Sequence, residues 1–272
     1  MDQDKISVIM GIYNCSSTLS EAIDSILNQT YKDWELIMCD DCSTDNTYEI
    51  AKEYQEQYPD KIRLIRNKRN MRLAYTLNHC LKYVTGYYVA RMDGDDISHE
   101  ERFEKQVAYL RTHPDIHLVG TAMQQFNELD GNIRIIYKPL HTDKWMLHKQ
   151  IPFHHATIMT YKSVYDELKG YTVAKRTNRG QDYDLWFRFF AKGFTGDNIQ
   201  EPLYLVREDL NAIKRRSLKG RMLAFQTTII GYKMLGYPKV WLIKEFFISL
   251  FKGITPHKVQ YMYRKLQQRR SK

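Results

Sequence analysis

The segment with the clearest chemical potential is Asp93-Gly94-Asp95-Asp96, which follows the apolar run Tyr87-Tyr88-Val89-Ala90. Three carboxylates within four residues repel one another, and a hard divalent cation held between them relieves that repulsion. The alternative is an acidic turn before a helix, since Ser98 and Glu101 have the spacing of a capping box. The pattern favours a metal site at a strand end, where a metal is well placed to hold phosphate.

Alternating apolar runs and amphipathic segments predict the elements that position this cluster. Strands are expected at residues 6–10, 34–39, 62–65 and 87–92, and helices at 18–27, 44–58 (capped by Ser43 or Thr44), 73–83 and 102–113. Such alternation predicts right-handed βαβ units, hence an α/β fold with a mostly parallel central sheet and helices on both faces.

Polar residues follow three of the predicted strands and should meet at one sheet edge, where open α/β folds bind nucleotides. Tyr13 could stack on a base, and Asp40 and Asp41 could accept hydrogen bonds from base or ribose. Neither G-x-G-x-x-G nor a P-loop motif is present, so metal and side chains must handle the phosphates. The residues describe a nucleoside-diphosphate site whose diphosphate is a leaving group.

The pattern is less regular after residue 113. Strands are expected at 116–121, 133–137, 156–161 and 203–207, and helices at 144–149, 163–168, 184–192 and from Arg221 onward. This part is expected to supply the acceptor side of a cleft.

Composition describes a globular chain of 272 residues, 43% of them hydrophobic, without an apolar run of 18 residues. The acidic start at residues 1–5 disfavours a secretory signal, so a cytoplasmic location is expected. Cys39 and Cys42 have the spacing of a zinc or redox pair, but Cys15 and Cys80 lack such partners. Cys39 is therefore expected to act as a small apolar side chain.

The net charge of +9 is concentrated at the C-terminus: from Arg207 onward there are 16 Lys/Arg and three acids. Residues 240–251, with Trp241, Phe246, Phe247 and Phe251, are too few to span a bilayer. They suit a helix on an anionic membrane surface, supported by the cations of residues 258–272. The alternative is a helix packed on the catalytic domain or on a partner in a homodimer.

Five ordered motifs across about residues 5–207 resemble the inverting glycosyltransferases of family two. They are Ser7–Met10 leading to Tyr13-Asn14 with Ser25–Tyr31; Asp40–Asp45 (D-D-x-S-x-D); Asn70 to Asn78 (N-x-G-L-A…L-N); Asp93–Ser98 with Arg102–Gln106 (D-x-D and its helix); and Gln181–Trp186 ([EQ]-D-x-D-L-W). The resemblance implies a GT-A nucleotide-diphospho-sugar transferase fold. It suggests a catalytic domain at 1–207, with a nucleotide-sugar half at 1–97 and an acceptor half at 98–207, followed by a basic helical region at 208–272.

The resemblance also implies roles for individual residues. Tyr13 and Asp41 would contact the base with Asp40 beside them, Asp93 would lie near the ribose and the metal, Asp95 would bind Mn²⁺ or Mg²⁺, and Asp182 would be the general base. Gln181, His155 and Trp186 are candidates for the sugar or acceptor pocket. The alternatives are a helix cap for Asp182 (a role Asp184 could fill), a buried hydrogen-bonded histidine for His155, and a core position for Trp186.

Two departures from the family pattern bear on the site. Arg72 replaces a usual glycine, so either the backbone changes or this cation points at the donor phosphates; we predict nucleotide binding. Many relatives place a histidine metal ligand where Glu208 and Asp209 stand here. Either acid could ligate the metal instead, or that loop supplies no ligand.

The function expected is metal-assisted, inverting transfer of a sugar from a UDP-sugar to a saccharide or lipid-linked saccharide. It would serve surface polysaccharide biosynthesis at the inner face of the membrane. A sugar-nucleotide pyrophosphorylase would need a glycine-rich basic loop, which Gly11–Cys15 does not supply. A basic nucleic-acid-binding protein is disfavoured, and no nucleic acid is expected as a partner, because the sheet edge is acidic.

Overall fold

The computed structural model describes residues 5–126, 133–207 and 218–255. The first part alternates strands and helices as predicted. Its elements are β1 (Ile6–Ile12), α1 (Leu19–Leu27), β2 (Trp34–Asp40), α2 (Thr47–Gln57), β3 (Ile62–Arg66), α3 (Leu73–Leu81) and β4 (Tyr88–Asp93). Each strand departs from its predicted bounds by at most two residues.

The second part mixes short strands with helices. Its elements are β5 (Ile97–Ser98), α4 (Arg102–Thr112), β6 (Leu118–Phe126), β7 (Ile133–Ile136), β8 (His141–Thr142), β9 (Met159–Tyr161), α5 (Lys162–Leu168), α6 (Gln181–Ala191) and β10 (Gly196–Arg207). Three 3₁₀ helices lie among them: η1 (Lys144–His148), η2 (His155–Thr157) and η3 (Lys175–Thr177). Two long helices follow, α7 (Leu218–Leu235) and α8 (Lys239–Ile254).

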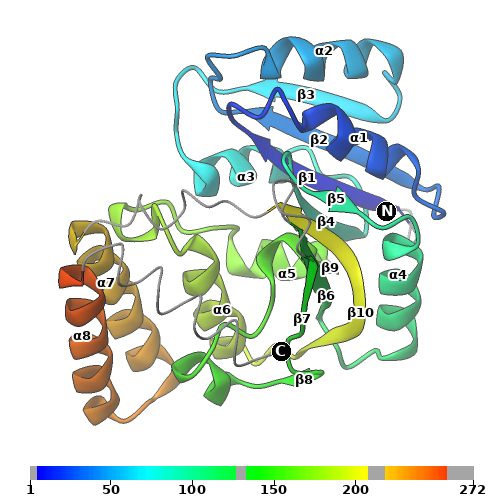
Figure 1. The fold of residues 1–272 in the computed structure, drawn as a ribbon. Helices are drawn as coiled ribbons and strands as arrows, with labels where there is room; N and C mark the ends of the chain where they lie inside the picture. Colours follow the sequence, from blue (N-terminus) through cyan, green and yellow to red (C-terminus); the bar gives the residue numbers. More distant parts are fainter. Residues whose placement is uncertain (1–4, 127–132, 208–217, 256–272) are drawn as a thin grey trace.

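One mixed sheet unites both parts, in the order β3-β2-β1-β4-β9-β6-β10-β5. Strands β1 to β4 pair in parallel, whereas β9 runs antiparallel to both β4 and β6. Strand β10 is longer than predicted: it begins at Gly196 and continues through Pro202, which has no N–H to donate and where the pairing with β6 shifts register. All four parallel strands therefore end at the same edge (Figure 1).

The two faces of the sheet carry separate hydrophobic cores, as strand alternation requires. Val8 and Met10 of β1 face the core formed with α1, α2 and α4. Ile9 faces the core formed with α3, α5 and α6, where Cys39 is fully buried as the small apolar side chain that was expected. Helices thus cover both faces (Figure 1).

The two C-terminal helices lie side by side at one end of the molecule, beyond α6 from the sheet (Figure 1). Tyr232 and Leu235 of α7 are buried in the core with α6. Trp241 of α8 stacks on His148, with ring centroids 4.1 Å apart. Helix α8 is therefore packed on the rest of the chain by one side, and the expected membrane contact of its other side stays a prediction.

Helix α7 crosses α6 at a glycine. A Cβ atom built on Gly231 would overlap the ring of Phe187, so a larger residue there would force the two helices apart. No helix in the three described ranges combines the length and apolar character needed to cross a bilayer.

Candidate active site

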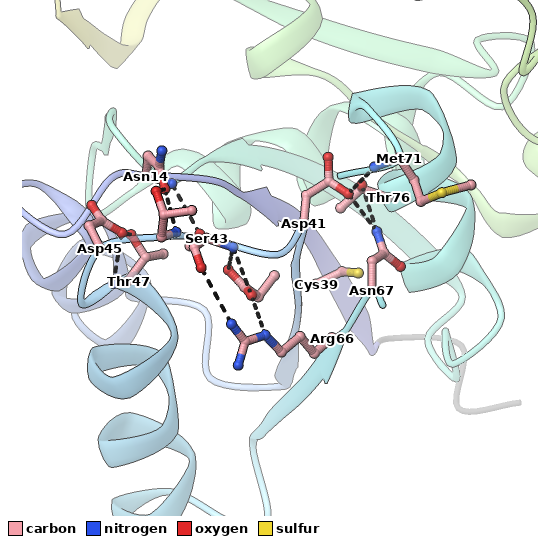
Figure 2. Close-up of polar contacts among 12 residues, drawn as sticks. Asn14, Cys39, Asp41, Ser43, Asp45, Thr47, Arg66, Asn67, Met71 and Thr76 are labelled. Atoms are coloured by element: carbon pink, nitrogen blue, oxygen red, sulfur yellow. Dashed lines mark hydrogen bonds and ion pairs between the residues drawn. The ribbon is translucent and has the colours of Figure 1, made fainter. Parts of the chain in front are cut away.

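Asp41, at the end of β2, organises the loop that leads into α3 (Figure 2). Its Oδ1 accepts hydrogen bonds from Asn67 Nδ2 (2.8 Å) and Met71 N (2.7 Å), and its Oδ2 accepts one from Arg72 N (2.8 Å). A carboxylate oxygen accepts about two hydrogen bonds, so Oδ2 keeps one acceptor position. Asp41 is thus fixed by the protein and retains the capacity to accept a hydrogen bond from a base.

Asp40 has a different environment from its neighbour. Its side chain is fully buried, pairs with Arg66 Nε at 2.9 Å and accepts a hydrogen bond from Ser43 N at 3.2 Å. Arg66 in turn lies 4.3 Å from the ring centroid of Tyr48. Asp40 therefore stabilises the loop after β2. Because its carboxylate is buried, it would act on the nucleobase through this loop and not by direct contact.

Tyr13 projects from the end of β1 with 47% of its surface exposed, as base stacking would require. The adjacent Asn14 adopts a positive φ of 49°, and its Oδ1 accepts a hydrogen bond from Thr44 N (2.9 Å). Ser43 Oγ accepts one from Asn14 N (3.1 Å; Figure 2). The prediction that Ser43 or Thr44 caps α2 is wrong: these residues join two loops, and the N-cap is Asn46.

Arg72 keeps the backbone that the usual glycine would adopt. Its φ of 73° and ψ of 160° lie in a region that non-glycine residues occupy only under strain of about 1–3 kcal/mol. Its side chain is exposed. The backbone has therefore not changed to suit the larger residue, which supports the other alternative, a role for the exposed guanidinium.

The acidic cluster brings together carboxylate oxygens from Asp93, Asp95 and Asp96, all within 4.8 Å of one another. Desolvation and the charge of Asp93 raise the pKa of Asp95. Asp96 is buried, and that burial, with its two acidic neighbours, raises its pKa to about 8. Oxygen ligands crowded by like charge fit a hard divalent cation well.

The capping-box alternative for this segment is wrong. Ser98 lies in β5, and the N-cap of α4 is Glu101, whose side chain makes no capping bond. Asp96 instead accepts a hydrogen bond from Arg207 N at 3.1 Å, which ties the cluster to β10. Asp95 is exposed at the same edge, consistent with the expectation that it is the main ligand.

Arg91 was not identified from the sequence, yet it is central to the site. It is 3% exposed and forms a two-pronged ion pair with Asp93. Its charge also opposes the rise in pKa that desolvation produces at Asp95 and Asp182. The missed signal is a cation inside an otherwise apolar strand, where a buried charge requires a partner. Asp93 is therefore already paired, which makes it a weaker metal candidate than Asp95.

Asp182 lies in the first turn of α6, which begins at Gln181 and is preceded by Gly180 at the N-cap. Desolvation raises its pKa, while the Tyr183 N–H and the charges of Arg91 and Lys138 oppose that rise. Lys138 is the second nearby cation that the sequence did not reveal. A partly buried carboxylate with a raised pKa suits a general base.

Asp184 has a structural role that differs from the helix cap proposed for it. It lies inside α6 and binds Arg176 Nη1 (2.5 Å), Arg188 Nε (2.9 Å) and Thr172 Oγ1 (2.6 Å). These bonds lower its pKa against the opposing effect of burial. Arg176 also donates to Thr227 of α7 at 3.2 Å, so this network links α6 to the C-terminal helices.

A cavity of about 990 Å³ opens beside Asp182. Gln181 and Asp182 form part of its wall, as does Leu73, the residue after Arg72. The opposite wall comes from α7 and α8, including Ala224, Thr228, Lys244, Glu245 and Ile248. The candidate base therefore faces a space that the C-terminal helices help to form.

Two predicted pocket residues do not line this cavity. Trp186 is fully buried and packs against Phe153, with ring centroids 5.0 Å apart, so it occupies the alternative core position. His155 Nε2 lies 2.8 Å from Tyr171 Oη, and burial followed by the charge of Arg91 lowers the pKa of His155 well below its usual range. This matches the hydrogen-bonded alternative. Glu208 and Asp209 lie outside the described residues.

Comparison with known proteins identifies the family. The family described as "Glycosyl transferase family 2" matches residues 7–168. The chain belongs to glycosyltransferase family 2. It is 48% identical to EpsE of Bacillus subtilis, whose name designates a glycosyltransferase, over 96% of this chain and 93% of EpsE. It is 30% identical to the O-antigen biosynthesis glycosyltransferase WbnJ of Escherichia coli, over 91% and 94% of the two chains.

Solved structures show the fold. TarS of S. aureus in complex with UDP-GlcNAc matches with a TM-score of 0.66 and 17% identity, over 83% of this chain and 66% of TarS. The mannosyltransferase PcManGT of Pyrobaculum calidifontis, in complex with GDP-Man and Mn²⁺, matches with a TM-score of 0.61 and 18% identity, over 92% and 72%. This family 2 glycosyltransferase therefore has the GT-A fold.

Proposed function

We propose that this glycosyltransferase moves a sugar from a UDP-sugar to a saccharide hydroxyl, with inversion at the anomeric carbon and with metal assistance. The observation that carries the proposal is the position of Asp182, whose raised pKa and place on a large cavity suit an acceptor base. Similarity to an O-antigen biosynthesis enzyme supports a role in surface polysaccharide synthesis.

The residues divide the reaction between them. Tyr13 and Asp41 hold the nucleobase of the donor. Asp95 and Asp93 would hold Mn²⁺ or Mg²⁺, because their crowded carboxylate oxygens suit such a cation. When bound, such a cation neutralises charge on the leaving diphosphate. Asp182 takes the acceptor proton as the acceptor oxygen bonds to the anomeric carbon and the bond to the diphosphate oxygen breaks.

A donor screen tests this proposal. Release of nucleoside diphosphate would be measured with UDP- and GDP-sugars and Mn²⁺, with EDTA as control, and the anomeric configuration of the product would be determined by NMR. We expect one UDP-sugar to be favoured, activity to disappear in EDTA, and the configuration to invert. Retained configuration or full activity in EDTA would contradict the proposal.

We also propose that α7 and α8 rest on an anionic membrane surface at the cytoplasmic face. Val240, Ile243, Phe247 and Phe251 recur on one side of α8, and all are more than half exposed. Ile229, Ile230 and Met234 of the neighbouring α7 are also exposed, by 41–43%. The six Lys/Arg within residues 258–272 provide charge complementary to anionic lipid.

Co-sedimentation with vesicles tests the membrane contact. The full chain should bind vesicles containing phosphatidylglycerol, and the double variant Ile243→Ser/Phe247→Ser should bind at least about tenfold more weakly. Ile133→Ser, at an exposed apolar site on β7, is the matched control. Unchanged binding by the double variant would refute the contact. A wild-type dimer that the same substitutions dissociate would instead assign this surface to a homodimer.

A further inference from the structure

The cavity beside Asp182 has an unusual wall, because the helices that carry the exposed apolar surface also enclose it. Segments at 147–151 and 178–183 form one side, and α7 and α8 form the other. Its volume of about 990 Å³ lies at the upper end of the range for small-molecule sites. None of Tyr13, Asp41 and Asp95 lines this space, so a nucleotide-sugar donor held by those residues would leave it for another ligand.

The charges around the cavity favour an anionic ligand. Four cations line it, Lys149, Arg179, Arg221 and Lys244, against two acids, Asp182 and Glu245. Three of these cations, Lys149, Arg179 and Lys244, have exposed side chains and come from three separate segments. Cations that converge from separate segments are suited to phosphate, which each can approach from a different direction.

Lys244 connects the cavity to the apolar surface. It lines the cavity together with Glu245 and Ile248, and it follows Ile243, which is 57% exposed on the outer side of α8. An amphiphile could therefore lay its hydrocarbon along α8, place its phosphate at Lys244 and Arg179, and extend its saccharide toward Asp182. The order of these features matches the order of groups in a lipid-linked saccharide.

We infer that this cavity is the subsite for the phosphate or diphosphate of a lipid-linked acceptor, and that α7 and α8 recognise this link as part of the acceptor site. The inference rests on the proposed sugar transfer, which it deepens by naming the acceptor class. It assigns Lys149, Arg179 and Lys244 to binding the acceptor, with no part in the chemical step.

Calorimetry on the full chain in EDTA tests the inference, with farnesyl diphosphate, farnesol and inorganic diphosphate as probes. We expect farnesyl diphosphate to bind at least about tenfold more tightly than either farnesol or inorganic diphosphate. The variant Arg179→Gln/Lys244→Gln should lose this advantage. The control Lys233→Gln/Lys239→Gln, with exposed cations of α7 and α8 that do not line the cavity, should keep it.

Two results would overturn the inference. Equal affinity for farnesol and farnesyl diphosphate would show that the phosphate is not recognised. An equal loss of farnesyl diphosphate affinity in both double variants would show that only the overall positive charge matters. Measuring UDP binding in the presence of Mn²⁺ distinguishes failure of the acceptor subsite from failure of the proposed function. If the Arg179/Lys244 variant binds UDP normally but still prefers farnesyl diphosphate, only the acceptor subsite is wrong; if the wild type fails to bind UDP, the proposed donor chemistry is wrong.

Discussion

The edge of the sheet that we propose as the donor site and the cavity that we propose as the acceptor site are built in different ways. At the donor edge, short loops after adjacent strands are fixed by direct bonds, as where Asp41 accepts hydrogen bonds from Met71 N and Arg72 N. The acceptor cavity is enclosed by segments from residue 73 to residue 248, and α7 and α8 form one wall. The first site is set by strand order, whereas the second depends on how separate helices pack.

This difference suggests where variation can occur without loss of the reaction. A donor site held by backbone N–H groups is fixed by the fold, because those groups do not depend on side-chain identity. A cavity walled by side chains of α7 and α8 changes with each substitution there. We therefore expect acceptor choice to follow the C-terminal helices and donor handling to follow the sheet edge.

The strongest test of this division is Asp182→Asn. Loss of the base should lower kcat by about 10²–10⁴-fold and leave UDP affinity unchanged, because Asp182 belongs to the acceptor side. In the wild type, kcat should decline as pH falls through the raised pKa of Asp182, since only the carboxylate accepts a proton. Asp166→Asn, at an exposed position on α5, is the control. Steady-state kinetics across pH would measure both effects, and a matching loss of UDP affinity would break the division.

A second test asks whether α6 is held in place by Asp184. Asp184→Asn removes one partner from a buried network with two arginines, and should lower the free energy of unfolding by about 2–4 kcal/mol near neutral pH. Chemical denaturation would measure this loss.

The pH dependence of that loss has a definite sign. Because the folded pKa of Asp184 lies below its usual value, its stabilisation is present above about pH 4 and is lost as pH falls through the lower folded pKa. The wild type and variant should therefore converge in stability in acid. A pH-independent difference would show that charge is not the cause. Asp166→Asn should cost less than about 1 kcal/mol.

The smallest effect is expected at the donor edge, from Arg72→Gly. Glycine removes the strain at φ 73° but adds entropy to the unfolded chain, so stability should rise by about 1 kcal/mol. UDP-sugar affinity should fall if the guanidinium reaches the phosphates. Arg69→Gly, at a position without positive φ, should be destabilising instead. Thermal unfolding and UDP titration would separate the two effects, and unchanged UDP affinity would remove Arg72 from the donor site.

The sequence was sufficient to locate the elements of the proposed donor half because their signals are local. Alternating apolar runs located β1 to β4, and the parallel order then placed Tyr13, Asp41 and Asp95 at one edge. The acceptor half was predicted less well. Trp186 and Asp182 lie four residues apart in one motif, yet packing buries the first and leaves the second on the cavity.

Other features depended on contacts between distant residues, which no local pattern encodes. The cavity itself could not be predicted, because Lys149 and Lys244 are brought together only by the packing of α8. Ser43 was predicted to cap α2, but the loop after β1 competes for its hydroxyl. The sequence shows the charge of Arg91 within β4 but not its partner, because Asp93 equally suits a metal or a ribose.

The glycine at the crossing of α6 and α7 has a further consequence. Because Gly231 lets the two helices touch, its size fixes how far α7 stands from the helix that carries Asp182. Alanine or serine there would add one or two atoms between α7 and Phe187 of α6. The two helices would move apart, and the cavity would widen without a change in any residue that lines it. In the proposed acceptor site, the size of the acceptor that can enter would thereby depend on a residue that the acceptor does not contact.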